Sequence, residues 1–168
     1  MAFPLTAHII RPYRPGEDRY VAEAHERIYR DYFGWGDNFS RYAKQVVYDF
    51  VNAPRREHAE MLIAETKGKP VGSIMLQETE KTGTGQLRLF LVEPSFQHSG
   101  IGIALWRTAM DTARKWRLNH LFLETAEPCT AARQIYAREG FVITDRRLAS
   151  DWALDGSPVY EERWDLDL

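Results

Sequence analysis

The chain has 168 residues, 44% of them hydrophobic and 27% charged, and these values suit one globular domain with one core. Its formal net charge of -2, from 22 Lys and Arg against 24 Asp and Glu, argues against a general nucleic-acid binder. The single cysteine, Cys129, excludes an internal disulfide. We therefore expect a single domain over residues 1–168 that has no nucleic-acid partner.

The amino-terminal residues lack the basic and apolar segments of a signal peptide. No apolar run approaches the ~20 residues of a membrane span. We therefore expect a cytoplasmic protein without membrane contact. The histidines at positions 8, 25, 58 and 120 show no paired metal spacing, so we expect no metal cofactor.

Hydrophobic periodicity predicts a strand over residues 6–11 and a helix from about residue 17 to residue 33. A second helix is predicted from Ser40, a plausible N-cap, to residue 51. Strands over 61–66 and 71–78 follow, joined by a tight turn. A leucine-rich strand over 86–92, expected to be buried on both faces, ends before Pro94.

The second half alternates between the two kinds of element. A helix is predicted over 100–117, a strand over 120–125, and a helix with Pro128 in its first turn and Gly140 as its C-terminal cap. Strands over 141–147 and 159–166 close the chain. This order predicts a mixed, mostly antiparallel sheet of about seven strands, flanked by about four helices and containing one strand–helix–strand crossover, in the α/β (α+β) class.

Residues 87–102, L-R-L-F-L-V-E-P-S-F-Q-H-S-G-I-G, join a strand to the start of a helix through a glycine-containing loop. The first N–H groups of a helix lack internal partners and lie at the positive end of its dipole, so such a loop binds a diphosphate without basic side chains. Gly100 and Gly102 remove Cβ atoms that would hold the ligand away. A dinucleotide motif would need glycine where Leu105 stands, which disfavours other nucleotide binders.

Q-H-S-G-I-G resembles the Q/R-x-x-G-x-G/A coenzyme A motif of the GNAT superfamily, and L-F-L-V-E-P resembles that family's fourth strand. The segment A-A-R-Q-I-Y-A-R-E-G-F, residues 131–141, is similar to its second signature. The resemblance implies a GNAT fold and an acetyl-coenzyme A-dependent N-acetyltransferase. Y-F-G-W-G-D-N-F and E-E-R-W-D-L-D-L also resemble the acetyltransferase domains sometimes fused to MarR-type regulators.

The resemblance also implies which residues bind the cofactor. The fourth strand would diverge from the fifth and bind the pantetheine arm through Leu91 and Val92. Backbone amides would surround the diphosphate at Gln97, His98, Ser99, Gly100, Ile101, Gly102 and Ile103. Cys129 stands where many relatives have an asparagine that contacts the arm. No His/Asp arrangement accompanies this thiol, so a structural role is favoured over a covalent acetyl-cysteine.

By the same resemblance, Tyr136 lies beside the thioester sulfur and is the candidate general acid. Unperturbed pKa values of ~10 for tyrosine and ~8.5 for a thiol suit proton transfer to the departing thiolate. The fourth strand offers Gln86 and Arg88 where some relatives have a glutamate. Glu124 is therefore the candidate base, and an ion pair at Glu124 or a chain of water molecules are the alternatives.

Trp35 and Phe39 would line the acceptor side, joined by Tyr32, Tyr42 and Trp152, and they predict an apolar or aromatic amine. Ordinary core packing is the alternative. A module that binds acyl-coenzyme A without catalysis, another acyl donor and a protein amine as acceptor all stay open. The sequence does not fix the oligomeric state, and pairing of residues 159–166 across a homodimer, as in many relatives, also stays open.

Overall fold

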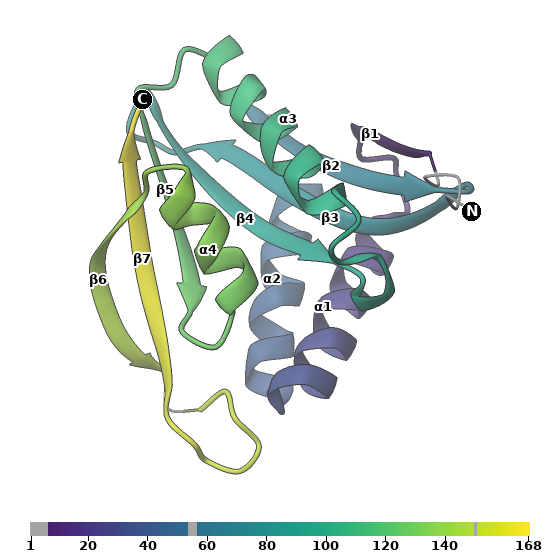
Figure 1. Cartoon of the computed structure of the whole chain (residues 1–168), viewed down its shortest axis with the longest axis vertical. Helices are drawn as coiled ribbons and strands as arrows, with labels where there is room; N and C mark the ends of the chain where they lie inside the picture. The colour runs from purple at the N-terminus through teal and green to yellow at the C-terminus, as the bar shows by residue number, and fades with distance from the viewer. Residues whose placement is uncertain (1–6, 54–56, 150) are drawn as a thin grey trace.

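The computed structural model describes residues 7–53, 57–149 and 151–168 (Figure 1). Seven strands form one sheet in the order β1-β2-β3-β4-β5-β7-β6. The elements are β1 (His8–Pro12), α1 (Asp18–Phe33), α2 (Asp37–Asn52), β2 (Ala59–Thr66), β3 (Lys69–Glu78), β4 (Thr84–Val92), a 3-10 turn (Pro94–Phe96), α3 (Ile101–Lys115), β5 (His120–Ala126), α4 (Thr130–Arg138), β6 (Val142–Ala149) and β7 (Val159–Asp167). Only β4 and β5 pair in parallel, so the predicted antiparallel sheet with one crossover is confirmed.

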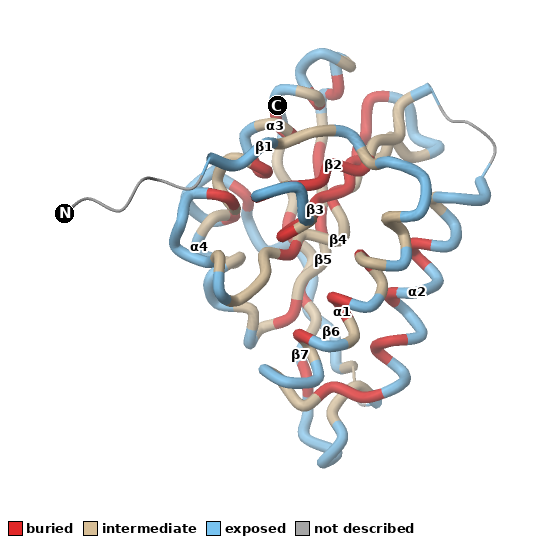
Figure 2. Tube along the Cα trace, turned by 90° about the vertical axis from the view of Figure 1, so that its right-hand side faces the viewer, coloured by how far each residue is buried: buried red, intermediate tan, exposed pale blue. Residues whose placement is uncertain are grey.

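Helices cover both faces of the sheet (Figure 1). On one face, α3 and α4 pack through Leu105, Trp106 and Tyr136 against alternate residues of the central strands. On the other, α1 and α2 contribute Val21 and Val47. Buried residues accordingly concentrate in the central strands (Figure 2). Strands β2 and β3 contain continuous buried runs, as expected for strands covered on both faces. The predicted burial of residues 86–92 on both faces is wrong, because only Leu87 and Leu91 of this range are buried. Among the helices of the described ranges, none is both long and apolar enough to span a bilayer.

The parallel pair β4–β5 is short. Its last partners are Leu87 and Leu123, and the two strands diverge beyond them (Figure 1). Leu89 has a φ of 53°, and the β3–β4 register shifts at the same place, which marks a β-bulge. The Ser73 hydroxyl donates to the Leu89 carbonyl at 2.7 Å, which satisfies an acceptor inside the irregular stretch. The bulge and the divergence that the family resemblance implied are both present.

Two predicted helix starts are wrong. Helix α2 begins at Asp37 with Gly36 at its N-cap, and the Ser40 amide bonds the Gly36 carbonyl at 3.1 Å within the first turn. Gly36 donates its own N–H to the Trp152 carbonyl at 2.8 Å, so a tertiary contact sets the start of this helix. Helix α4 begins at Thr130, after Pro128 rather than around it.

Other boundaries agree with the sequence. Gly140 has a φ of 94° just past α4, and the following Phe141 amide bonds the Tyr136 carbonyl at 3.0 Å, as expected for a glycine cap. The first strand begins at His8; position 6 of the predicted strand lies outside the described residues. The pairing of residues 159–166 across a dimer, which the sequence left open, does not fit this fold, because β5 and β6 occupy both edges of β7.

Candidate active site

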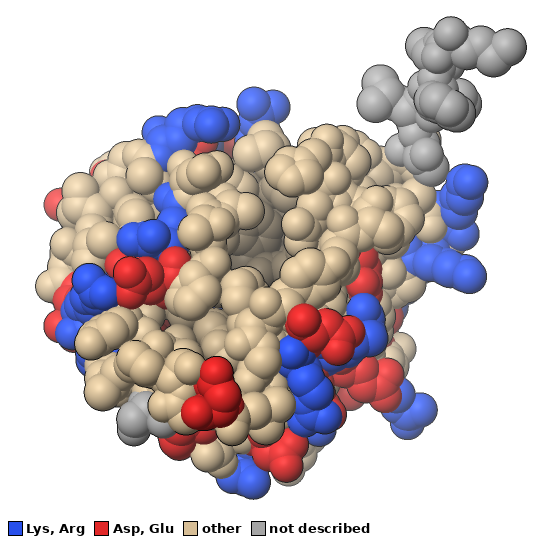
Figure 3. Space-filling view, turned by 60° about the horizontal axis from the view of Figure 1, so that its bottom comes forward, with Lys and Arg blue, Asp and Glu red and all other residues tan. Residues whose placement is uncertain are grey.

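A cavity of about 110 Å³ lies where β4 and β5 diverge. Its wall combines residues of the four helices, of strands β3, β4, β5 and β7, and of the segment before β7. This end of the molecule is visibly hollowed, and uncharged residues border the hollow (Figure 3). The aromatic rings and imidazole of the cavity wall belong to His25, Tyr29, Trp35, Phe39, Tyr42, Phe90, Trp106, Tyr136 and Trp152.

The loop that leads into α3 leaves its backbone amides available. The N–H groups of residues 98–103 have no hydrogen-bond partner within the described part of the chain. Two side chains stabilise the loop instead: Gln97 Nε2 donates to the Val92 carbonyl at 3.3 Å, and Ser99 Oγ donates to the Phe96 carbonyl. His98 and Gly100 both have positive φ, 61° and 88°. Such a run of unpaired amides ahead of a helix is an anion-binding arrangement.

The two glycines of this loop have different reasons to be glycine. A Cβ on Gly100 would meet no atom within 4 Å, but its φ of 88° strains any other residue. Gly102 has ordinary helical geometry, and a Cβ there would touch Val92 Cγ2 at 3.6 Å without a clash. The fold alone therefore explains Gly100, and it leaves Gly102 without an internal explanation.

Leu91 and Val92 lie beyond the last β4–β5 pair. The Leu91 side chain is buried against Ala24 and Ile28 of α1, while its backbone pairs with Ser73 of β3. Neither residue pairs with β5. Their backbone edge on the β5 side is consequently not part of the sheet ladder and faces the divergence between the strands.

Tyr136 of α4 lines the cavity from the α3–α4 face, and its side chain is buried. The ring lies among Trp106, Phe90, Phe141 and Trp164, with centroid distances from 5.5 to 6.5 Å. Burial raises the pKa of its hydroxyl above the ordinary value of 10.0. The phenol therefore keeps its proton at neutral pH and can donate it.

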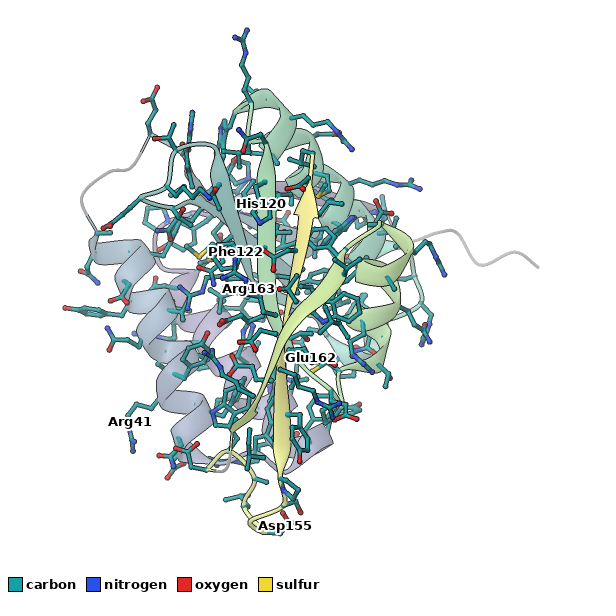
Figure 4. The ribbon with its side chains drawn as sticks, turned by 90° about the vertical axis from the view of Figure 1, so that its left-hand side faces the viewer. Arg41, His120, Phe122, Asp155, Glu162 and Arg163 are labelled. Carbon is teal, nitrogen blue, oxygen red and sulfur yellow. The ribbon has the colours of Figure 1, made fainter. Side chains whose placement is uncertain are left out.

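A buried ion pair holds α4 against β7. Arg133 Nη2 donates to Glu162 Oε2 at 3.1 Å, and Arg133 Nε lies 2.7 Å from Oε1 without hydrogen-bond alignment. Glu162 is only 1% exposed and lies near the middle of β7 (Figure 4). Because Arg133 is one turn before Tyr136, this pair fixes the turn of α4 that carries the phenol.

Glu124 is the first β5 residue beyond the parallel pairing. Its Oε1 accepts from Arg147 Nη2 at 3.1 Å, so the ion pair left open by the sequence is present, and Arg147 also contacts Glu161 at 3.1 Å. Burial, and then repulsion from Glu161, raise the pKa of Glu124 above its ordinary value, and Arg147, Arg88 and Arg163 oppose the rise. A carboxyl group with a raised pKa suits proton transfer.

Arg88 is the residue opposite Glu124 at the point of divergence, the first on β4 beyond the pairing. It lines the cavity, and its Nη2 donates to the Tyr42 hydroxyl at 3.2 Å. No carboxylate oxygen of the described residues lies within 4.0 Å of its guanidinium. The other arginines near Glu124 are paired: Arg147 with Glu161, and Arg163 with Asp165 at 2.9 Å. Arg163 also stacks 4.1 Å over the Phe122 ring (Figure 4).

Trp35 and Phe39 line the cavity and are also buried, at 2% and 7% exposure. Their ring centroids lie 5.0 Å apart, and Trp152 lies 5.2 Å from Trp35. These side chains can therefore pack in the core and also contact an acceptor in the cavity. Tyr42 joins the wall as expected, but Tyr32 is 63% exposed and lies outside it, so that expectation is wrong.

His25 is a cavity residue that the sequence interpretation did not assign to the site. It is 4% exposed, and its Nδ1 lies 2.7 Å from the Val21 carbonyl. Its ring stacks on Tyr29 at 5.8 Å. Burial lowers the pKa of the imidazole from 6.5 to about 4, so it is neutral at pH 7. The sequence feature that could have revealed His25 is its position four residues after Val21, on the buried face of α1.

Cys129 also lines the cavity, at the N-cap of α4. Burial raises the pKa of its thiol, which disfavours the nucleophilic thiolate and agrees with a structural role. Within the described ranges, no cluster of three or more His, Cys, Asp or Glu side chains is arranged to hold a metal ion.

Comparison with known proteins agrees with this geometry. The model of the acetyltransferase (GNAT) family matches residues 22–141. N-acetyltransferase 8F1 of Rattus norvegicus is 29% identical over 127 residues, which make up 73% of this chain and 58% of that relative, so the chain spans little more than half the relative's length.

Solved structures show the same fold. The ribosomal-protein-S18-alanine N-acetyltransferase of Escherichia coli matches with a TM-score of 0.72 and 20% identity, over 96% of this chain and 94% of that one. A Salmonella typhimurium structure that contains its cofactor acetyl-CoA matches with a TM-score of 0.71 and 15% identity, over 96% and 94%. The family match covers well over half of the sequence, and the chain belongs to the acetyltransferase (GNAT) family.

Proposed function

We propose that this chain is a single-domain N-acetyltransferase that moves the acetyl group of acetyl-coenzyme A to a primary amine by direct attack in a ternary complex. One observation carries the proposal. The β4–β5 divergence opens a cavity that is lined from both faces of the sheet, beside a loop whose amides of residues 98–103 are unpaired. Two ligands that enter from opposite sides would meet at this point.

For the cofactor, the loop amides of residues 98–103 would bind the diphosphate, and the unpaired backbone edge of Leu91 and Val92 would bind the pantetheine arm. The Gln97 amide, which was expected to join them, already donates to the Pro94 carbonyl at 3.3 Å. Acetyl-coenzyme A supplies the activated acetyl group when bound. The free amides, the positive φ of Gly100 and the unexplained Gly102 support this assignment. No basic side chain is required at the loop itself.

For the chemistry, Tyr136 would protonate the departing thiolate, since its protonated phenol lines the cavity. The raised pKa of this phenol opposes the role, because it makes the group a weaker acid. Glu124 would take the proton of the attacking amine, directly or through water. Its ion pair with Arg147 opposes this role, and its raised pKa supports it. Trp35 and Phe39 would contact an apolar part of the acceptor, because both rings form the acceptor-side wall.

The proposal is tested by calorimetry with acetyl-coenzyme A, together with thiol release on a panel of aromatic, aliphatic, polyamine and peptide amines. Binding followed by thiol release on an amine supports the enzyme. Binding without release on any acceptor would replace the enzyme by an acyl-coenzyme A-binding module. Absence of binding would remove the whole assignment.

Tyr136→Phe tests the general acid. We expect kcat to fall about 100-fold, the lower range for general acid catalysis, while the Kd of coenzyme A stays unchanged. Tyr29→Phe is the matched control, because it removes another phenol from the same cavity wall. Equal kcat values for the two variants would remove Tyr136 from the mechanism.

A further inference from the structure

We infer that the amine acceptor also carries a carboxylate, and that Arg88 binds it. This inference rests on the proposed function and adds the substrate class: a small zwitterionic amine, such as an α-amino acid, with an aromatic or apolar side chain. The observation behind it is that Arg88 lines the cavity and has no acidic partner within 4.0 Å in the described part of the chain.

Arg88 lies on the acceptor side of the sheet. It stands opposite Met75 in the β3–β4 register, and opposite residues of an antiparallel pair share a face. Met75 is buried among residues of α1 and α2, and the Arg88 guanidinium contacts Tyr42 of α2. The loop at residues 97–103 leads into α3, on the other face. Arg88 is therefore placed to bind the acceptor rather than the diphosphate.

The donors of Arg88 are mostly unused. A guanidinium has five N–H donors in a planar fork that matches a carboxylate. Here one neutral hydroxyl, that of Tyr42, is its hydrogen-bond acceptor. Arg147 and Arg163, the other arginines that act on Glu124, already have carboxylate partners. A bound carboxylate would neutralise Arg88 in a half-buried, aromatic environment.

Opposite charges at the point of divergence match both ends of a zwitterion. Glu124 and Arg88 are the first residues beyond the last β4–β5 partners, one on each strand. Arg147 contacts Glu124 Oε1, so Oε2 is left for an ammonium group. An amine that approaches Glu124 can therefore place a nearby carboxylate on Arg88. The amino end of a protein lacks such a neighbouring carboxylate, so this pairing favours a free small molecule.

The cavity suits an apolar side chain of modest size. Its volume is about 110 Å³, which is below the roughly 150 Å³ of an apolar cavity that holds benzene. The rings of Phe39, Tyr42 and Trp152 lie on the same side as Arg88. L-Phenylalanine combines amine, carboxylate and aromatic ring, and 2-phenylethylamine lacks only the carboxylate, so the two compounds are matched probes.

The test measures kcat/KM for both probes with wild type, Arg88→Met and Arg88→Lys. Wild type should prefer L-phenylalanine at least 10-fold. Arg88→Met should lose about 10- to 100-fold on L-phenylalanine, the value of a charge-assisted bond, and about 3-fold or less on 2-phenylethylamine. Arg88→Lys should lie between them, because it keeps the charge without the fork. The different basicities of the two amines cancel when the ratio between probes is compared between wild type and each variant.

Arg163→Met is the matched control, because it removes a charge that acts on Glu124 from outside the cavity wall. It should affect both probes equally. Equal losses on both probes in Arg88→Met, or no preference in wild type, would overturn the inference and leave the acetyltransferase intact. If no amine is acetylated, the proposed function fails. In that case, calorimetry measures how L-phenylalanine binds to the coenzyme A complexes of wild type and Arg88→Met. Weaker binding to Arg88→Met supports the carboxylate site. Equal binding to the two proteins, or no detectable binding to wild type, overturns it.

Discussion

The buried imidazole of His25 makes the stability of this fold depend on pH. Its pKa in the folded chain, about 4, is below the ordinary 6.5, so the unfolded chain binds more protons between these two values. Stability is therefore complete above about pH 6.5 and is lost as pH falls toward 4. At ~1.36 kcal/mol per pH unit, the full loss is roughly 3 kcal/mol, with about 2 kcal/mol lost by about pH 5.

His25→Phe should remove this loss, because its ring cannot be protonated and the Val21 carbonyl keeps its helical partner. The assay is urea unfolding followed by tryptophan fluorescence, from about pH 7.5 to about pH 4.5. Other titrating groups cancel in the difference between the two proteins. Ile28→Val is the control on the same buried face, and it should cost about 1 kcal/mol at every pH. A difference between wild type and His25→Phe that does not change with pH would refute the argument.

Two further pairs of variants follow from the geometry. Arg133→Met should lower the free energy of unfolding by about 3 kcal/mol in urea, since it leaves the Glu162 charge buried and unpaired. Adding Glu162→Leu should restore most of this loss. If the losses of the two single variants simply added in the double variant, the argument would be wrong. Gly100→Ala should lower stability by about 1 kcal/mol because its φ is 88°, whereas Gly102→Ala should raise stability by up to about 1 kcal/mol yet weaken coenzyme A binding. Thermal unfolding measures the two opposite changes in stability, and calorimetry measures the affinity for coenzyme A. If Gly102→Ala left that affinity unchanged, the diphosphate would not bind at this turn.

The sequence predicts most of the fold because periodicity reflects burial directly. The apolar stripe predicted for residues 100–117 is buried in α3 at Leu105, Ala109 and Ala113, whereas its last member, Trp116, is half-buried just past the helix. The mixed sheet and the GNAT family are confirmed. The predicted helix boundary is wrong where a contact between residues distant in the chain determines the start of the helix. Ser40 is a good N-cap residue, yet the bond between Gly36 and Trp152 starts α2 earlier. No local pattern contains that contact.

The loop and the aromatic part of the acceptor wall could be predicted from the sequence, but the polar part of the wall could not. A strand, a glycine loop and a helix are consecutive, so their unpaired amides follow from local geometry. The polar part of the wall instead collects His25, Arg88 and Glu161, which are distant in the chain and meet only in the folded sheet. Glu161 in particular gave no signal, because an alternating charge on a strand also fits a solvated face.

The bulge at Leu89 links the two halves of the candidate site. In a regular strand, Leu87 and Leu91 would share a face, because side chains alternate with a period of two. Here Leu87 packs under α3 and α4, whereas Leu91 packs on α1. Arg88 and Leu89 consequently share the acceptor side, and Phe90 turns to the side of Trp106 and Tyr136. One irregular residue thus ends the pairing with β5 and divides β4 between the proposed acceptor side and the proposed cofactor side.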